Sequence, residues 1–241
     1  MCRILAVSET PTNLRYDLPL DFEILGKGIY SPRQAARLVG GSAQEVRRWT
    51  RGSGPSEPLW HAYYQGLDDT AELSFADLIE VRVVKAFKEA GISTQAIRFA
   101  INYAQNAFGV ERPLSTLGFK TDGGEILMDA VERDGEFVSL AKARPGQKVF
   151  AELVKQSVRD LEYEGQTAAR WRPHHVHGIV LDPTRQFGTP LIDEFGVSTS
   201  VLYEEFKHLG DPKYLAKLYD MPASLVRAAI KYEASLDGVN G

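Results

Sequence analysis

A glutamine and three arginines near the amino-terminal end have the types and spacing to contact nucleic acid. Gln44, Arg47, Arg48 and Arg51 follow one another at helical intervals in the segment 30–51. That segment holds five arginines and one glutamate, an excess of four positive charges in a chain whose net charge is −4. Arginine donates hydrogen bonds to guanine edges and phosphates, and a helix fits the DNA major groove. The segment therefore indicates either a DNA-reading helix or a solvated charged helix of an ordinary helical domain.

Three histidines are the only residues whose spacing suggests a metal site. His174, His175 and His177 fall in a stretch that we expect to be extended, which would put His175 and His177 on one face. No third or fourth ligand lies near them in the sequence, so we expect surface or interface histidines. The single cysteine, Cys2, excludes an internal disulfide and a cysteine-based zinc site. We expect no metal and no cofactor.

No arrangement in the sequence is typical of catalysis. Adjacent carboxylates such as Asp68-Asp69 and Glu204-Glu205 are expected to be solvated surface charges. A glycine-rich phosphate loop, a nucleophile elbow and a zinc-protease motif are all missing. We therefore do not expect an enzyme.

Strong capping signals predict two helices that would position the arginines. Ser31-Pro32 starts the first helix and Gly40-Gly41 ends it. Ser42 and Glu45 form a capping box at the start of the second, whose Val46 and Trp49 would face the first helix. The predicted DNA contacts are Arg33, Arg37, Ser42, Gln44, Arg47, Arg48, Arg51 and Trp60.

In the rest of the chain, glycine, proline and serine residues mark the predicted ends of secondary-structure elements. The aromatic stretch 58–66 predicts a short hairpin, or wing, and Ser74 and Ser93 cap two more helices. Alternation and glycine pairs predict short strands over 113–140, then a helix over about 147–163 and extended chain over 169–181. From 198 onward the pattern is helical, and 211–230 repeats the helix-turn-helix spacing. The positive charges of this segment are partly offset by the carboxylates of Asp211, Asp220 and Glu233. This charge balance favours an element that contacts protein or forms a dimer over one that reads DNA.

Two groups of aromatic residues allow alternative interpretations. Trp60, Tyr63 and Tyr64 could stack with Arg51 on a sugar-phosphate edge, or could form a small aromatic core. Trp171, between two arginines, could bind an acidic groove of a partner, although a basic edge strand protected against aggregation is favoured.

Composition is that of a globular protein, with 44% hydrophobic and 25% charged residues among 241. No apolar run is long enough to span a membrane, and residues 1–28 lack the form of a signal peptide. We therefore expect a cytoplasmic location.

The segment from 29 to 108 resembles the DNA-binding domain of the MerR family. Those domains join a helix-turn-helix and a wing to a helix pair like LSFADLIEVRVVKAFKEAGISTQAIR (73–98). The matching positions are Phe75, Asp77, Leu78, Gly91, Ser93, Ile97 and Arg98. The usual Gly-Tyr-Arg of the wing is absent, with Trp60 and His61 in its place. A long carboxy-terminal dimerisation helix with cysteine ligands is also absent, which leaves MerR-type metal sensing unsupported.

The segment 179–233 resembles a small helical domain of bacterial antitoxins. The matching positions are Asp182-Pro183, Gly188, Pro190, Ile192, Gly196-Val197, Thr199, Val226, Ala229 and Tyr232-Glu233. A MerR-like head fused to this tail is similar to long VapB-type antitoxins. The resemblance implies a homodimer that neutralises a PIN-like ribonuclease toxin encoded next to it and binds operator DNA to repress its own operon. The residues we expect to contact the toxin are Trp171, Phe187, Tyr203, Phe206 and Tyr232.

These observations predict a mainly α-helical protein with short β elements. Its parts would be an arm (1–28), a MerR-like winged helix-turn-helix domain (29–110), an α+β connecting or dimerisation region (111–181) and a helical antitoxin-type domain (182–241). The alternative function is a stand-alone regulator that senses a small ligand through residues 113–181.

Overall fold

The structure is a computed structural model that describes residues 26–134 and 146–238. Over these residues the chain is mainly α-helical with short antiparallel strands, as predicted. Most of the predicted arm (1–28) and the end of the predicted strand region (135–140) lie outside the described residues. In the described ranges no helix combines the length and the apolar character needed to cross a membrane.

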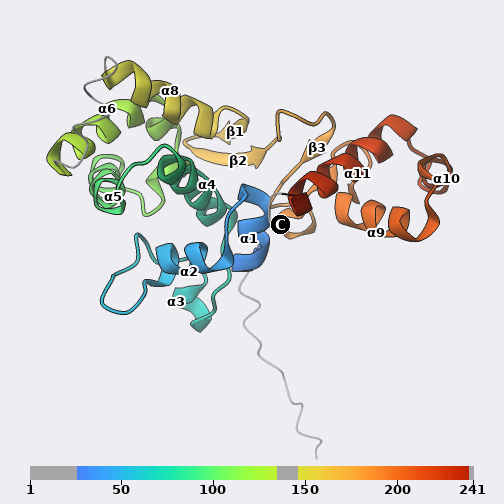
Figure 1. The fold of residues 1–241 in the computed structure, drawn as a ribbon, viewed down its shortest axis with the longest axis horizontal. Coiled ribbons are helices and arrows are strands. Elements are labelled where there is room, and N and C mark those ends of the chain that lie inside the picture. The colour runs from blue at the N-terminus through green and yellow to red at the C-terminus, as the bar shows by residue number, and fades with distance from the viewer. Residues whose placement is uncertain (1–25, 135–145, 239–241) are drawn as a thin grey trace, which may run out of the picture.

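The amino-terminal part consists of helices packed around one core (Figure 1). Its elements are α1 (Pro32–Val39), α2 (Ala43–Arg51), α3 (Gln65–Asp68), α4 (Phe75–Glu89), α5 (Thr94–Phe108), η1 (Pro113–Ser115), α6 (Leu117–Asp134) and α8 (Gly146–Val158). The buried side chains of this core run from Tyr30 to Leu181. The predicted units 29–110 and 111–181 therefore pack together around shared apolar residues.

The carboxy-terminal part has its own smaller core, between Ile179 and Leu236. In the sequence before this core, β1 (Leu161–Glu164) and β2 (Thr167–Trp171) form an antiparallel pair. A second antiparallel sheet, of β3 (Ile179–Val180), β4 (Leu191–Ile192) and β5 (Val197–Ser198), contributes Ile179 and Ile192 to the core. The remaining elements are η2 (Gln186–Gly188), α9 (Thr199–Leu209), α10 (Pro212–Leu218) and α11 (Ala223–Gly238). Leu38 of α1 packs against both cores, so α1 lies where the two parts meet.

The prediction of short strands over 113–140 is wrong for the described residues, because 117–134 form α6. The pair Gly123-Gly124 indicated a turn, but both glycines are helical and buried. A Cβ on Gly124 would lie 2.7 Å from the Cα of Ala151 on α8, and a Cβ on Gly123 would lie 2.9 Å from the ring of Phe119. Gly124 is required because α6 and α8 approach closely there, whereas Gly123 leaves room for the ring of Phe119 on its own helix.

This contact predicts a measurable cost for one added methyl group. Gly124→Ala should lower the free energy of unfolding by about 1–3 kcal/mol, since α6 and α8 must move apart. Gly66→Ala on α3 is the matched control, because nothing lies within 4 Å of its added Cβ. Urea unfolding would measure both variants. An equally stable Gly124→Ala protein would contradict the close approach.

Candidate nucleic-acid interface

The first two helices are the helix pair that the sequence predicts, and both are capped at their amino-terminal ends. Ser31 and Gln34 form a capping box on α1, and Gly40 ends that helix with a φ of 72° in the left-handed region. Ser42 and Glu45 form the predicted box on α2. The backbone N–H of Ser42 donates to Glu45 and lowers the pKa of that carboxyl group. The start of α2 is thus fixed by local hydrogen bonds.

One face of α2 holds it against the core and leaves the other face to solvent. Val46 and Trp49 are buried, as predicted, and the carbonyl of Trp49 accepts a hydrogen bond from the backbone of Leu59. Gln44, Arg47 and Arg48 are exposed on the other side. Their orientation follows from the 3.6-residue period of the helix.

The predicted arginines fall into two groups. Arg33, Arg47 and Arg48 are exposed, and within residues 26–134 and 146–238 their guanidinium groups make no hydrogen bond or close ion pair; the charge of Arg48 only helps to lower the pKa of Glu45. Arg51 donates instead to the carbonyls of Asp69 and Thr70 and to the Asp69 carboxylate at 2.7 Å. An unpaired guanidinium keeps all its donors available for phosphate or base oxygens.

Arg37 joins α1 to α11 rather than facing solvent freely. Its guanidinium donates to Glu233 Oε2 at 2.7 Å and to Asp237 Oδ1 at 2.7 Å. The Glu233 side chain is only 1% exposed, and it also accepts a hydrogen bond from the Thr199 hydroxyl. The two parts of the chain are therefore linked by a part-buried ion pair between residues 196 positions apart.

The predicted hairpin over 58–66 does not form, so a hairpin wing is not present in this stretch. It is a loop that leads into the single turn α3. Trp60 and Tyr64 are each 5% exposed: the Trp60 indole donates to Asp77, and the Tyr64 hydroxyl donates to the carbonyl of Gly28. These two contacts direct the aromatic rings inward, which agrees with the aromatic-core interpretation. Trp60 is thus enclosed, although we predicted it as a DNA contact.

A single buried carboxylate, that of Asp77 on α4, organises this loop. It accepts hydrogen bonds from the Trp60 indole, the Tyr63 backbone and both the backbone and hydroxyl of Ser74. Arg112 completes the set at 2.9 Å. The sequence showed Asp77 only as a helix-start residue, because three of its partners lie outside that turn.

The residues predicted to contact a toxin are also divided between core and surface. Trp171 and Tyr232 are buried at 6% and 1% exposure, and the Trp171 indole donates to Asp160. Phe206 packs against the second core, and Lys207 covers the ring of Tyr203. Phe187 is 57% exposed and has a positive φ of 55°. Phe187 is therefore the most accessible of the five, and Tyr203 and Phe206 are partly buried.

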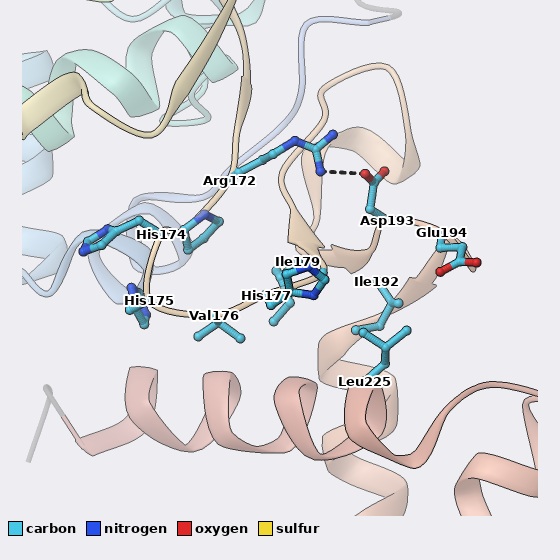
Figure 2. Close-up of a pocket in the computed structure, with 12 residues that line it drawn as sticks. Arg172, His174, His175, Val176, His177, Ile179, Ile192, Asp193, Glu194 and Leu225 are labelled. Atoms are coloured by element: carbon cyan, nitrogen blue, oxygen red, sulfur yellow. Dashed lines mark hydrogen bonds and ion pairs between the residues drawn. The ribbon is translucent and has the colours of Figure 1, made fainter.

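The three histidines lie in the turn between β2 and β3, not in an extended strand as predicted. They line a groove of about 750 Å³ together with Arg172 and Asp193 (Figure 2). The Arg172 guanidinium donates a hydrogen bond of 2.6 Å to Asp193 Oδ2. Burial lowers the pKa of His175. In the part of the chain that the structure describes, no three histidine, cysteine or carboxylate groups are arranged to hold a metal ion.

Comparison with known proteins identifies a related sequence and a related structure. No family model matches the chain. It is 28% identical over 203 residues to a protein of Mycobacterium tuberculosis (strain ATCC 25618 / H37Rv) named "Putative antitoxin VapB45", over 76% of this chain and 81% of that protein. The crystal structure of Rv2018 from Mycobacterium tuberculosis has a similar fold, with a TM-score of 0.65 and 23% identity over 83% of this chain and 96% of that chain. The first similarity supports a relationship to VapB-type antitoxins, and the second shows a shared fold.

Proposed function

We propose that this protein is the antitoxin of a toxin–antitoxin pair, which neutralises a PIN-like ribonuclease toxin and binds operator DNA to regulate its own operon. The relative named as an antitoxin, similar over three quarters of the chain, supports the first role. The exposed side chains of Arg47 and Arg48 on α2 support the second, and they are the observation that carries the DNA-binding half of the proposal.

In this proposal α2 enters the major groove as the reading helix of a MerR-like head. Gln44, Arg47 and Arg48 contact base edges, while Arg33 and the Ser42 end of α2 contact phosphates. Arg37 and Arg51 act through their intramolecular ion pairs, because both would have to break these pairs to reach DNA. The protein binds as a homodimer, since one reading helix covers only one half-site of an operator.

The toxin binds to the carboxy-terminal part, which has its own core and presents a folded surface. This arrangement leaves α2 free, because α9 and α10 lie on the other side of α1 from α2 (Figure 1). Phe187, Tyr203 and Phe206 remain candidate contacts, whereas Trp171 and Tyr232 act as core residues.

The experiment that tests the DNA-binding role is a titration of the protein with the DNA segment upstream of its own gene. We expect specific binding at least about 10³-fold tighter than to a scrambled duplex at the same salt concentration. We also expect the affinity to fall linearly with the logarithm of salt concentration, as for any interface that neutralises phosphates. Equal affinity for both duplexes would contradict operator recognition.

A further inference from the structure

The outer end of the carboxy-terminal part exposes large apolar side chains. Leu209, Tyr214 and Leu218 are 51%, 53% and 57% exposed. Among the described residues they are three of the four most exposed large hydrophobic side chains, and they lie within ten consecutive positions. We call these three residues the tail patch. Contiguous apolar patches on a protein surface mark interaction sites.

The geometry of α10 explains why two of these residues stay outside. The helix packs on α9 and α11 through Leu215 and Ala216, which are 0% and 9% exposed. Tyr214 and Leu218 are four residues apart, so they lie one above the other on the side of α10 turned away from this core. Leu209 ends α9 three residues before α10 begins. The patch is therefore built on two capped helices.

Two lysines border the patch. Lys213 and Lys217 form the adjacent row of α10, and both are exposed. Within the described ranges neither ammonium group makes an ion pair or hydrogen bond, while the nearby Asp211 carboxylate accepts from the backbone of Lys213 as the helix cap. The surface thus combines an apolar centre with two lysines that have no internal partner in the part of the chain that the structure describes, and the exposed Asp211 and Asp220 lie beyond the two ends of α10.

We propose that the tail patch is the docking surface for the toxin, and that the complementary toxin surface is an apolar depression bordered by carboxylates. This inference rests on the proposed antitoxin function and identifies its binding surface. Apolar residues at the centre and charges at the border are the usual anatomy of protein–protein interfaces. Unpaired lysines favour an acidic partner, because complementary charges steer association and select the partner.

DNA is a poorer occupant for this surface, although α10 and α11 have helix-turn-helix spacing. In such a motif the first helix crosses the phosphate backbone. Here that helix would press Tyr214 and Leu218 against phosphates, which would remove water from charged groups without hydrogen bonds in return.

The test measures the affinity of the full-length chain for the toxin encoded by the neighbouring gene, by isothermal titration calorimetry. Leu218→Asp should weaken binding at least tenfold, and Tyr214→Ala and Lys217→Glu should each weaken it severalfold. Leu67→Asp is the matched control, because Leu67 is an equally accessible leucine (48% exposed) on α3 of the other part. It should bind the toxin like the unaltered chain. Since all four side chains are exposed, circular dichroism should show native helix content in each variant.

The outcomes separate this inference from the function on which it rests. If the unaltered chain binds no toxin, the antitoxin function fails and the inference fails with it. If the unaltered chain binds toxin and Leu218→Asp and Tyr214→Ala bind as tightly, only the docking surface is wrong. Loss of operator affinity, or dissociation of a homodimer by light scattering, with unchanged toxin affinity would instead assign the patch to DNA or to a second copy and overturn the inference.

Discussion

Alanine at both Arg47 and Arg48 should weaken binding to operator DNA by about 30-fold or more. Each arginine that reads a base contributes about 1–3 kcal/mol, and 1.4 kcal/mol corresponds to a factor of ten in affinity. Both side chains are exposed and neither makes a hydrogen bond or a close ion pair among the described residues, so the unbound protein should keep its stability to within about 1 kcal/mol. Fluorescence anisotropy with a labelled operator duplex would measure the effect.

The salt dependence distinguishes base reading from phosphate contact. If both side chains contact phosphates only, the slope of log affinity against log salt should fall by about two and discrimination between duplexes should persist. The control is the double variant Arg227→Ala, Lys231→Ala, which removes two exposed cations from α11. Unchanged affinity after Arg47→Ala, Arg48→Ala would exclude α2 as the reading helix.

Asp77→Ala should lower the free energy of unfolding by about 3–5 kcal/mol. The carboxylate is fully buried and paired with Arg112, and removal of one partner of a buried ion pair leaves the other charge uncompensated. The Trp60 indole and two backbone groups would also lose their acceptor. Urea unfolding followed by far-ultraviolet circular dichroism would give the loss.

Glu111 supplies a matched control for this variant, because Arg112 also pairs with its carboxylate. The Glu111 side chain is 85% exposed, and surface ion pairs contribute about 0–1 kcal/mol. Glu111→Ala should therefore change the stability by less than about 1 kcal/mol. A similar small loss for Asp77→Ala would show that the buried hydrogen-bond cluster does not hold the loop 57–64 against α4.

The helices with local signals at both ends were predicted well from the sequence. Ser31, Ser42, Ser74 and Ser93 cap the helices that they were predicted to start, because the hydroxyl bonds to a backbone N–H within the same turn. Such contacts depend on residues three positions apart. They can therefore be read directly from the chain.

The incorrect predictions concern residues whose structural contacts come from distant parts of the sequence. The pair Gly123-Gly124 indicates a turn in the sequence, whereas glycine is needed at position 124 because the backbone of Ala151 on another helix lies against it. Trp60 was placed in an exposed wing, but Asp77 and the core draw it inward. Local periodicity contains no information on either partner, so these positions required the three-dimensional fold.

In the candidate site, too, features set by local sequence were predicted, and features set by distant contacts were not. The sequence predicted that Gln44, Arg47 and Arg48 face outward on α2, since burial of Val46 and Trp49 determines the rest of that helix. It could not show that Arg37 is bound by Glu233, 196 residues away. Residue type alone did not separate an arginine that is free to bind DNA from one that links two parts of the protein.

The most direct test of the antitoxin function is a titration of the ribonuclease activity of the toxin encoded next to this gene. Increasing amounts of the full-length chain would be added to a fixed amount of that toxin, with cleavage of a labelled RNA as the readout. We predict that cleavage falls to the background level when the two proteins reach a fixed stoichiometric ratio. Cleavage that persists in a tenfold excess of the chain would contradict the proposed function.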